Sequence, residues 1–174
     1  MSVKFKVSGP FEIPYRGAGQ GHAKHIDPSH GRAFWEEDAS EFAMKQGCYV
    51  FALRTGGGYY IPWYVGKTKN ILKGECFTTH KLGHYNRVVF DMRGTPVLFF
   101  VTRSDGKKNI PKDMLKQVEI FLIQAAKLKN DDLVNTQHTK NIPTWSIAGV
   151  VRSGQGESSK LSDIFRYMLN LWHT

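Results

Sequence analysis

The sequence predicts an α/β domain with a small, largely antiparallel sheet that is flanked by helices and carries N- and C-terminal additions. Two observations support this prediction. Apolar runs at 48–53 and 59–65 are separated by a glycine-rich turn, as expected of a β-hairpin. Apolar residues then recur at helical spacing after Pro111 and again after Ser159, as expected of two amphipathic helices. A chain of 174 residues that mixes both kinds of pattern fits one domain.

Residues 1–46 are interpreted as an N-terminal extension that packs on the core. The segment is rich in glycine, proline and histidine. Alternation of apolar and polar residues over 3–7 predicts a short strand. A weaker pattern over 35–44 predicts a short helix with its apolar residues facing inward.

The predicted core spans 47–136 and begins with the hairpin. Pro62 lies within the second strand of this hairpin, which indicates an edge strand or a bulge. Residues 70–77 predict a short helix, in which Gly74 is unfavourable. A buried strand is expected at 96–102.

A long helix is expected from Pro111, because proline is favoured in the first helical turn. We expect the chain to end with an extended segment at 145–151 and a helix capped by Ser158 or Ser159, both within a C-terminal addition at 137–174. The predicted apolar face of the long helix consists of Met114, Val118, Phe121, Leu122, Ala125 and Leu128.

Charge and cysteine content limit the class of protein. The formal net charge is +9, and residues 67–129 hold 13 Lys and Arg against 5 Asp and Glu. Such a basic surplus predicts a polyanionic partner, with nucleic acid as the expectation. Cys48 and Cys76 are expected to be free thiols in a cytoplasmic protein. The sequence shows no apolar run near the roughly 20 residues of a spanning helix, so no membrane association is expected.

The hairpin carries two short motifs, GCYV at 47–50 and WYVGK at 63–67. A later helix carries VEIFLI at 118–123, and Asn135 follows it. In this order and on these elements, the motifs resemble those of the GIY-YIG nuclease superfamily over 47–136. The resemblance implies a catalytic core in which two hairpin tyrosines, a helical glutamate and a later asparagine serve a nuclease site.

Phosphodiester hydrolysis needs an activated water, a cation against developing charge, and a positioned metal. Tyr49 and Tyr64 are expected on adjacent antiparallel strands, where their phenols can converge and position or deprotonate a water. Glu119 interrupts an apolar run, so its carboxylate needs a partner; Mg²⁺ or Mn²⁺ would supply one. Lys67 can contact a phosphate or help to activate a water. The alternatives are two ordinary strand tyrosines, a Glu119 salt bridge to a lysine, and a solvent-exposed Lys67.

The sequence departs from the family in its catalytic arginine. The resemblance implies an arginine about two helical turns after Gly66, but residues 69–76 contain none. Lys73, Lys81 and Arg87 are the candidates for this cationic role. We rank Arg87 first because its guanidinium suits phosphate oxygens, and Lys81 second.

The segment 79–87 is dense in functional side chains. If it is helical, His80, His84 and Arg87 share one face, and histidine can act as a general base. A basic binding helix without chemistry is the alternative. The predicted catalytic residues are Tyr49, Tyr64, Lys67, His80, Lys81, Arg87 and Glu119, with Glu119 as the metal ligand. The predicted nucleic-acid-binding residues are Lys67, Lys73, Lys81, His84, Tyr85, Arg87 and Asn135.

Together these patterns predict a metal-dependent endonuclease that acts on nucleic acid, DNA rather than RNA. The first alternative is a catalytically silent module that binds nucleic acid or a protein. The second is an enzyme of another class, which would need a deep polar pocket. The hypotheses differ in whether the two tyrosines, Glu119 and a cation share one cleft.

Overall fold

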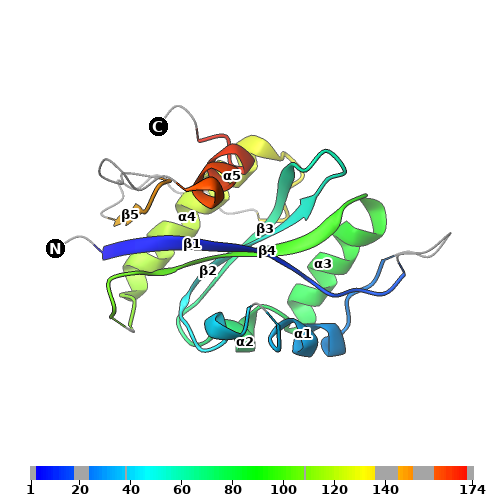
Figure 1. Ribbon diagram of the computed structural model, residues 1–174, viewed down its shortest axis with the longest axis horizontal. Helices are drawn as coiled ribbons and strands as arrows, with labels where there is room; N and C mark the ends of the chain where they lie inside the picture. The colour runs from blue at the N-terminus through cyan, green and yellow to red at the C-terminus, as the bar shows by residue number, and fades with distance from the viewer. Residues whose placement is uncertain are drawn as a thin grey trace.

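The computed structural model is built around a five-stranded sheet with the strand order β3-β2-β4-β1-β5 (Figure 1). Four strands pair antiparallel, and β5 runs parallel to β1. The predicted largely antiparallel α/β fold is therefore confirmed. The structure describes residues 3–17, 24–37, 39–107, 109–135, 145–150 and 159–171.

The elements follow one another along the chain as strands and helices of very different length. They are β1 (Val3–Glu12), α1 (Pro28–Phe34), the 3₁₀ helix η1 (Ser40–Phe42), β2 (Gly47–Arg54), β3 (Tyr60–Thr68), α2 (Leu72–Glu75), α3 (Thr79–Asp91), β4 (Thr95–Arg103), α4 (Lys112–Lys129), β5 (Trp145–Ile147) and α5 (Lys160–Met168). Among the described residues, no helix is long and apolar enough to cross a membrane.

The N-terminal strand is longer than predicted and lies inside the sheet. β1 pairs antiparallel with β4 on one side and parallel with β5 on the other. Its alternating residues Val3, Phe5 and Val7 are buried in the core, which explains the pattern in the sequence. This segment therefore contributes a strand to the sheet as well as covering it.

The helix predicted at 35–44 was wrong in position. A helix already ends at Phe34, and only the short η1 lies within the predicted range. Asp27 begins α1, because its carboxylate accepts hydrogen bonds from the backbone N–H of Ser29 at 2.8 Å and of His30 at 3.3 Å. An aspartate followed by proline is a strong helix start, and the apolar pattern alone does not reveal it.

Pro62 lies where the hairpin departs from regular pairing. Phe51 pairs with Tyr64, whereas the next residue of β2, Ala52, pairs with Pro62. Trp63 is therefore an extra residue in β3, and β3 is also an edge strand of the sheet. Both expectations for this proline, an edge and a bulge, are confirmed.

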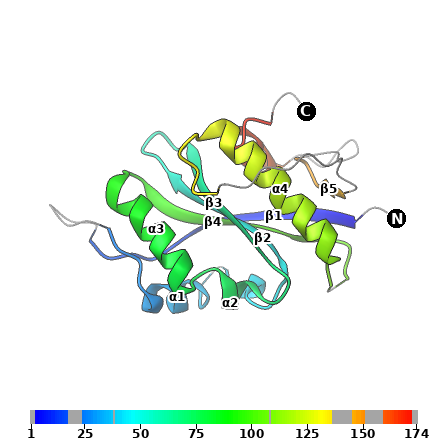
Figure 2. The same ribbon diagram turned by 180° about the vertical axis from the view of Figure 1, so that it is seen from behind.

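Helices cover both faces of the sheet (Figures 1 and 2), and the sheet separates two hydrophobic cores. Helices α4 and α5 cover one face, and α1, α2 and α3 cover the other. Successive side chains of β2 alternate between the cores: Cys48 and Val50 face α4, whereas Tyr49 and Phe51 face α3. A side chain on the hairpin is thereby assigned to one face by its position in the strand.

The predicted long helix and the predicted C-terminal cap are present. Ser159 accepts a hydrogen bond from the backbone N–H of Ser162 at 3.1 Å at the start of α5. On α4 the expected apolar face was wrong at its end, because the Leu128 side chain is 80% exposed. The buried stripe contains the predicted Val118 and Leu122 together with Leu115, which was not predicted.

Candidate functional site

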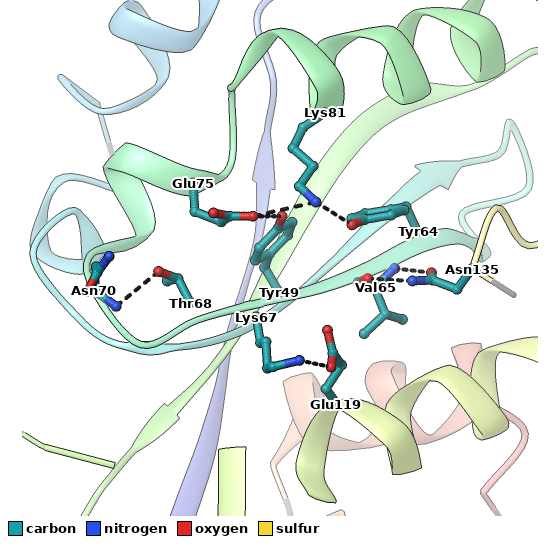
Figure 3. Close-up of polar contacts among 10 residues, drawn as sticks. All are labelled: Tyr49, Tyr64, Val65, Lys67, Thr68, Asn70, Glu75, Lys81, Glu119 and Asn135. Carbon is teal, nitrogen blue, oxygen red and sulfur yellow. Dashed lines mark hydrogen bonds and ion pairs between the residues drawn. The ribbon is translucent and has the colours of Figure 1, made fainter. Parts of the chain in front are cut away.

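Two tyrosines of the hairpin lie side by side on the α3 face of the sheet, as predicted. Tyr49 pairs with Gly66 across the strands, and Tyr64 lies two residues before that glycine. The ring centroids of Tyr49 and Tyr64 are 6.2 Å apart, with planes inclined by 41°. Figure 3 shows both rings rising from the same side of the hairpin.

Glycine at position 66 makes room for the first tyrosine. A Cβ atom placed on Gly66 would lie 2.3 Å from Cζ and 2.4 Å from the hydroxyl oxygen of Tyr49. No real Cβ atom tolerates such a distance, so the Tyr49 ring can cross the strand here only over glycine. The YVG motif therefore has a packing reason that is separate from any chemistry.

Lys81 on α3 and Glu75 at the end of α2 connect the two tyrosines (Figure 3). The Lys81 ammonium donates a hydrogen bond to the Tyr64 hydroxyl at 2.5 Å and lies 3.4 Å from Glu75 Oε1. The Tyr49 hydroxyl donates to the same Glu75 oxygen at 3.5 Å. These four residues, Tyr49, Tyr64, Glu75 and Lys81, are called the tyrosine–lysine cluster below.

Glu75 was missed by sequence reasoning. The residue lies in a short helix that the sequence predicted only weakly, beside a lysine and a glycine of ordinary appearance. The available signal was its position directly before Cys76, whose side chain is fully buried. The Glu75 side chain is itself 33% exposed, so this signal is weak; its carboxylate pairs with Lys81.

Burial and neighbouring charge set the protonation states of the cluster. Burial, followed by the neighbouring Tyr85, raises the pKa of Tyr49 far above its ordinary value. Tyr49 therefore stays neutral and can donate a hydrogen bond, but its phenolate cannot serve as a base. Burial alone would lower the pKa of Lys81, yet hydrogen bonding and charge from Tyr64 and Glu75 raise it overall. Lys81 is thus a fixed cation.

Two histidines extend the cluster along α3. The His84 ring stacks on the Tyr64 ring with centroids 5.2 Å apart, and the His80 ring meets His84 edge-on at 4.3 Å. Burial, then the charges of His80, Lys81 and Arg87, lower the pKa of His84. His84 is therefore neutral near neutral pH and can accept a proton, as a general base must, whereas the His80 side chain is exposed.

Arg87, ranked first as the catalytic cation, lies outside the tyrosine–lysine cluster. Its side chain is exposed and lines a separate cavity of about 380 Å³ together with Trp63 and Asp91. Lys73 is exposed on α2, and its side chain makes no hydrogen bond or ion pair within the described part of the chain. The structure therefore places Lys81, the second-ranked candidate, against the tyrosines.

Tyr85 was wrongly expected to contact nucleic acid. Its side chain is fully buried and stacks on the Phe51 ring with centroids 4.2 Å apart. Helical spacing puts Tyr85 on the same inward face as Leu82 and Val88, so its aromatic ring serves the core. No surface of this ring remains for a ligand.

Asn135 closes part of the outer edge of β3. Its side-chain amide accepts a hydrogen bond from the Val65 N–H at 2.7 Å and donates one to the Val65 carbonyl at 2.7 Å (Figure 3). The backbone N–H of Val134 donates a hydrogen bond to the Trp63 carbonyl, and the Asn130 side-chain amide donates one to the Pro62 carbonyl. Asn135 thus acts first as a structural partner of the edge strand.

Lys67 and Glu119 meet on the other face of the sheet. Lys67 alternates with Gly66 along β3 and therefore points to α4, where its ammonium pairs with the Glu119 carboxylate (Figure 3). The Glu119 side chain is 12% exposed. The salt bridge that the sequence left open as an alternative is present, and the tyrosines and Glu119 do not lie on one face.

The donor set around Glu119 limits how a divalent ion could bind. Within the described residues, no three His, Cys, Asp or Glu side chains converge as a metal site. Glu119 offers one carboxylate. A single carboxylate suits Mg²⁺ or Mn²⁺ only where waters and substrate phosphates fill the remaining coordination positions of the metal, as is common for Mg²⁺. Lys67 would have to release the carboxylate.

Comparison with protein-family models, curated proteins and solved structures found no match to this chain.

Proposed function

We propose that this protein is an endonuclease of GIY-YIG type that hydrolyses phosphodiester bonds in nucleic acid, with DNA as the expected substrate. The observation that supports it most is the tyrosine–lysine cluster. A fixed cation, Lys81, lies between the hydroxyl of one motif tyrosine and a carboxylate that holds the other. Both tyrosines lie on the hairpin that carries the two motifs.

In the proposed reaction, the scissile phosphate lies against Lys81 and the Tyr64 hydroxyl. The Lys81 ammonium stabilises the negative charge that develops on the phosphoryl oxygens, because a preorganised cation needs no reorientation during the reaction. Glu75 and Tyr64 hold the ammonium from two sides and fix its direction.

A water attacks phosphorus and gives a proton to neutral His84, whose ring is stacked on Tyr64. The bond between phosphorus and the leaving sugar oxygen breaks, and that oxygen takes a proton from solvent. Tyr49 contributes a neutral hydroxyl that orients Glu75. Glu119 lies on the opposite face of the sheet, so a divalent ion that it held would supply positive charge to a part of the substrate on the α4 side and not to the phosphate against Lys81.

A catalytically silent binding module remains the second candidate. It is favoured by one observation: Lys81 is already hydrogen-bonded to Tyr64 and paired with Glu75, so its charge is partly used within the protein. The two functions differ in whether Lys81 supports turnover or only binding.

The test is cleavage of single- and double-stranded DNA and RNA with Mg²⁺, Mn²⁺ or EDTA. We expect wild-type cleavage of DNA, and a loss of about 10²–10³-fold in kcat for Lys81→Gln with the Kd for DNA little changed. Lys6→Gln is the matched control, because it removes the same charge from an exposed site on β1, outside the predicted binding residues. Wild-type protein that binds DNA and never cleaves it, with any of these ions, would favour the silent module.

A further inference from the structure

A cavity of about 320 Å³ lies where β3 ends and the chain turns into α2. Its polar lining consists of Lys67, Thr68, Lys69, Asn70, Glu75 and Lys112. Thr68 accepts a hydrogen bond from the Asn70 N–H at 3.1 Å, which shapes the turn (Figure 3). The cavity is thus walled by the strand end, the following turn and the start of α4.

Positive charge dominates this cavity. Three lysines line it against one carboxylate, Glu75. Lys67 is paired with Glu119, and Glu75 is paired with Lys81. Lys69 and Lys112 are both exposed, and neither has an ion-pair partner among the residues that the structure describes. Two ammonium groups are therefore available to an anion from outside.

The cavity connects the two groups of site residues that the sheet separates. Glu75 lines it from the α3 side and belongs to the tyrosine–lysine cluster, whereas Lys67 lines it from the α4 side. Among the residues that the structure describes, the segment 130–135 covers the outer edge of β3 as far as Val65, and the cavity begins at Lys67. A strand of substrate that passes this end of β3 can therefore reach both faces.

The lining selects a phosphate over a base. No aromatic side chain lines the cavity, so a nucleobase would find no ring to stack on. Lysine ammonium groups are compact charges suited to phosphate oxygens. Contacts of this kind fix the position of a nucleic acid without reading its sequence.

We propose that this cavity binds the backbone phosphate next to the scissile one, with Lys69 and Lys112 as its ligands. The inference rests on the proposed function, because the neighbouring phosphodiester is the one that lies against Lys81 and Tyr64. The ligand is an internal phosphodiester of the same strand. Binding of this phosphate sets the register of the nucleic-acid strand across the end of β3.

The test compares Lys69→Gln/Lys112→Gln with Lys4→Gln/Lys6→Gln, which removes two exposed lysines from β1 instead. The affinity for a short DNA duplex is measured by fluorescence anisotropy in EDTA over a range of NaCl concentrations. The cavity variant should lower the slope of log K against log[salt] by about 0.9, since it removes the lysines that neutralise one phosphate of a DNA duplex. The β1 variant should leave the slope unchanged.

An unchanged slope in the cavity variant, or an equal fall in both variants, would overturn the proposal. Duplexes with and without a 5′-phosphate separate an internal from a terminal phosphate: a loss confined to the 5′-phosphorylated duplex would also overturn it. The readout needs no cleavage. If the cavity variant has a reduced slope but the wild type never cleaves DNA, the proposed function is refuted and the phosphate site is retained. If the wild type cleaves DNA but the cavity variant has an unaltered slope, the phosphate site is refuted and the proposed function is retained.

Discussion

Gly66→Ala tests the packing that places Tyr49 in the cluster. The added Cβ would lie 2.3 Å from Tyr49 Cζ and 2.4 Å from its hydroxyl oxygen, more than 1 Å inside ordinary contact at about 3.5 Å. The Tyr49 ring is fully buried and cannot swing into solvent. Overpacking of this kind costs about 1–3 kcal/mol, so the free energy of unfolding should fall by that amount.

The assay is urea denaturation, and a double-mutant cycle identifies the cause. In a Tyr49→Ala background the clashing ring is absent, so Gly66→Ala should cost much less there than in the wild type. Gly83→Ala is the matched control: its Cβ would meet nothing within 4 Å, and it lies inside α3. Because alanine favours helix over glycine, that change should stabilise the protein by about 0.5–1 kcal/mol. Additive effects of Gly66→Ala and Tyr49→Ala would refute the steric argument.

Two further predictions concern the general base and the edge strand. Since the pKa of His84 is lowered below its ordinary value, His84 stays neutral to lower pH. The rate of cleavage should therefore stay constant down to below pH 6.5 and then fall. His84→Gln should abolish this acid limb in the pH–rate profile. A limb that persists in the variant would assign the base elsewhere. Asn135→Ala removes two hydrogen bonds to Val65 and should lower the free energy of unfolding by about 1–3 kcal/mol and speed amide exchange at Val65. Asn130→Ala removes one hydrogen bond to the Pro62 carbonyl and one from the Asp132 N–H, and neither involves Val65; amide exchange at Val65 should therefore stay slow in that variant, and faster exchange there would contradict this account.

The fold was largely predictable because apolar spacing reports burial directly. The strand alternation that placed Tyr49 and Tyr64 on one face follows from the period of two in a β-strand. The same period places Lys67 on the opposite face, a consequence that the motif order alone did not reveal. Residues read as one constellation along the chain can therefore face two sides of a sheet.

The candidate site was less predictable because its partners come from short or poorly periodic segments. Glu75 lies in a helix of four residues, for which helical periodicity carries almost no signal. The choice of Lys81 over Arg87 depends on how α3 packs against the sheet. The sequence does not reveal that packing, so it could not show which of the two cations lies against the tyrosines. Tyr85 differs from its neighbours only in facing inward, which the Leu82 and Val88 spacing could have shown.

The position of β1 has a consequence for how the chain reaches this structure. β1 comes first in the sequence, yet Phe5 pairs with Arg103 and Val3 pairs with Trp145. Local hairpin pairing of β2 with β3 can form early, whereas β1 has no strand partner before β4 has been made. Closing such long loops carries an entropic cost and is typical of slowly folding topologies. The alternating residues of β1 are then exposed for longest, so this strand is where premature association between chains would begin during synthesis.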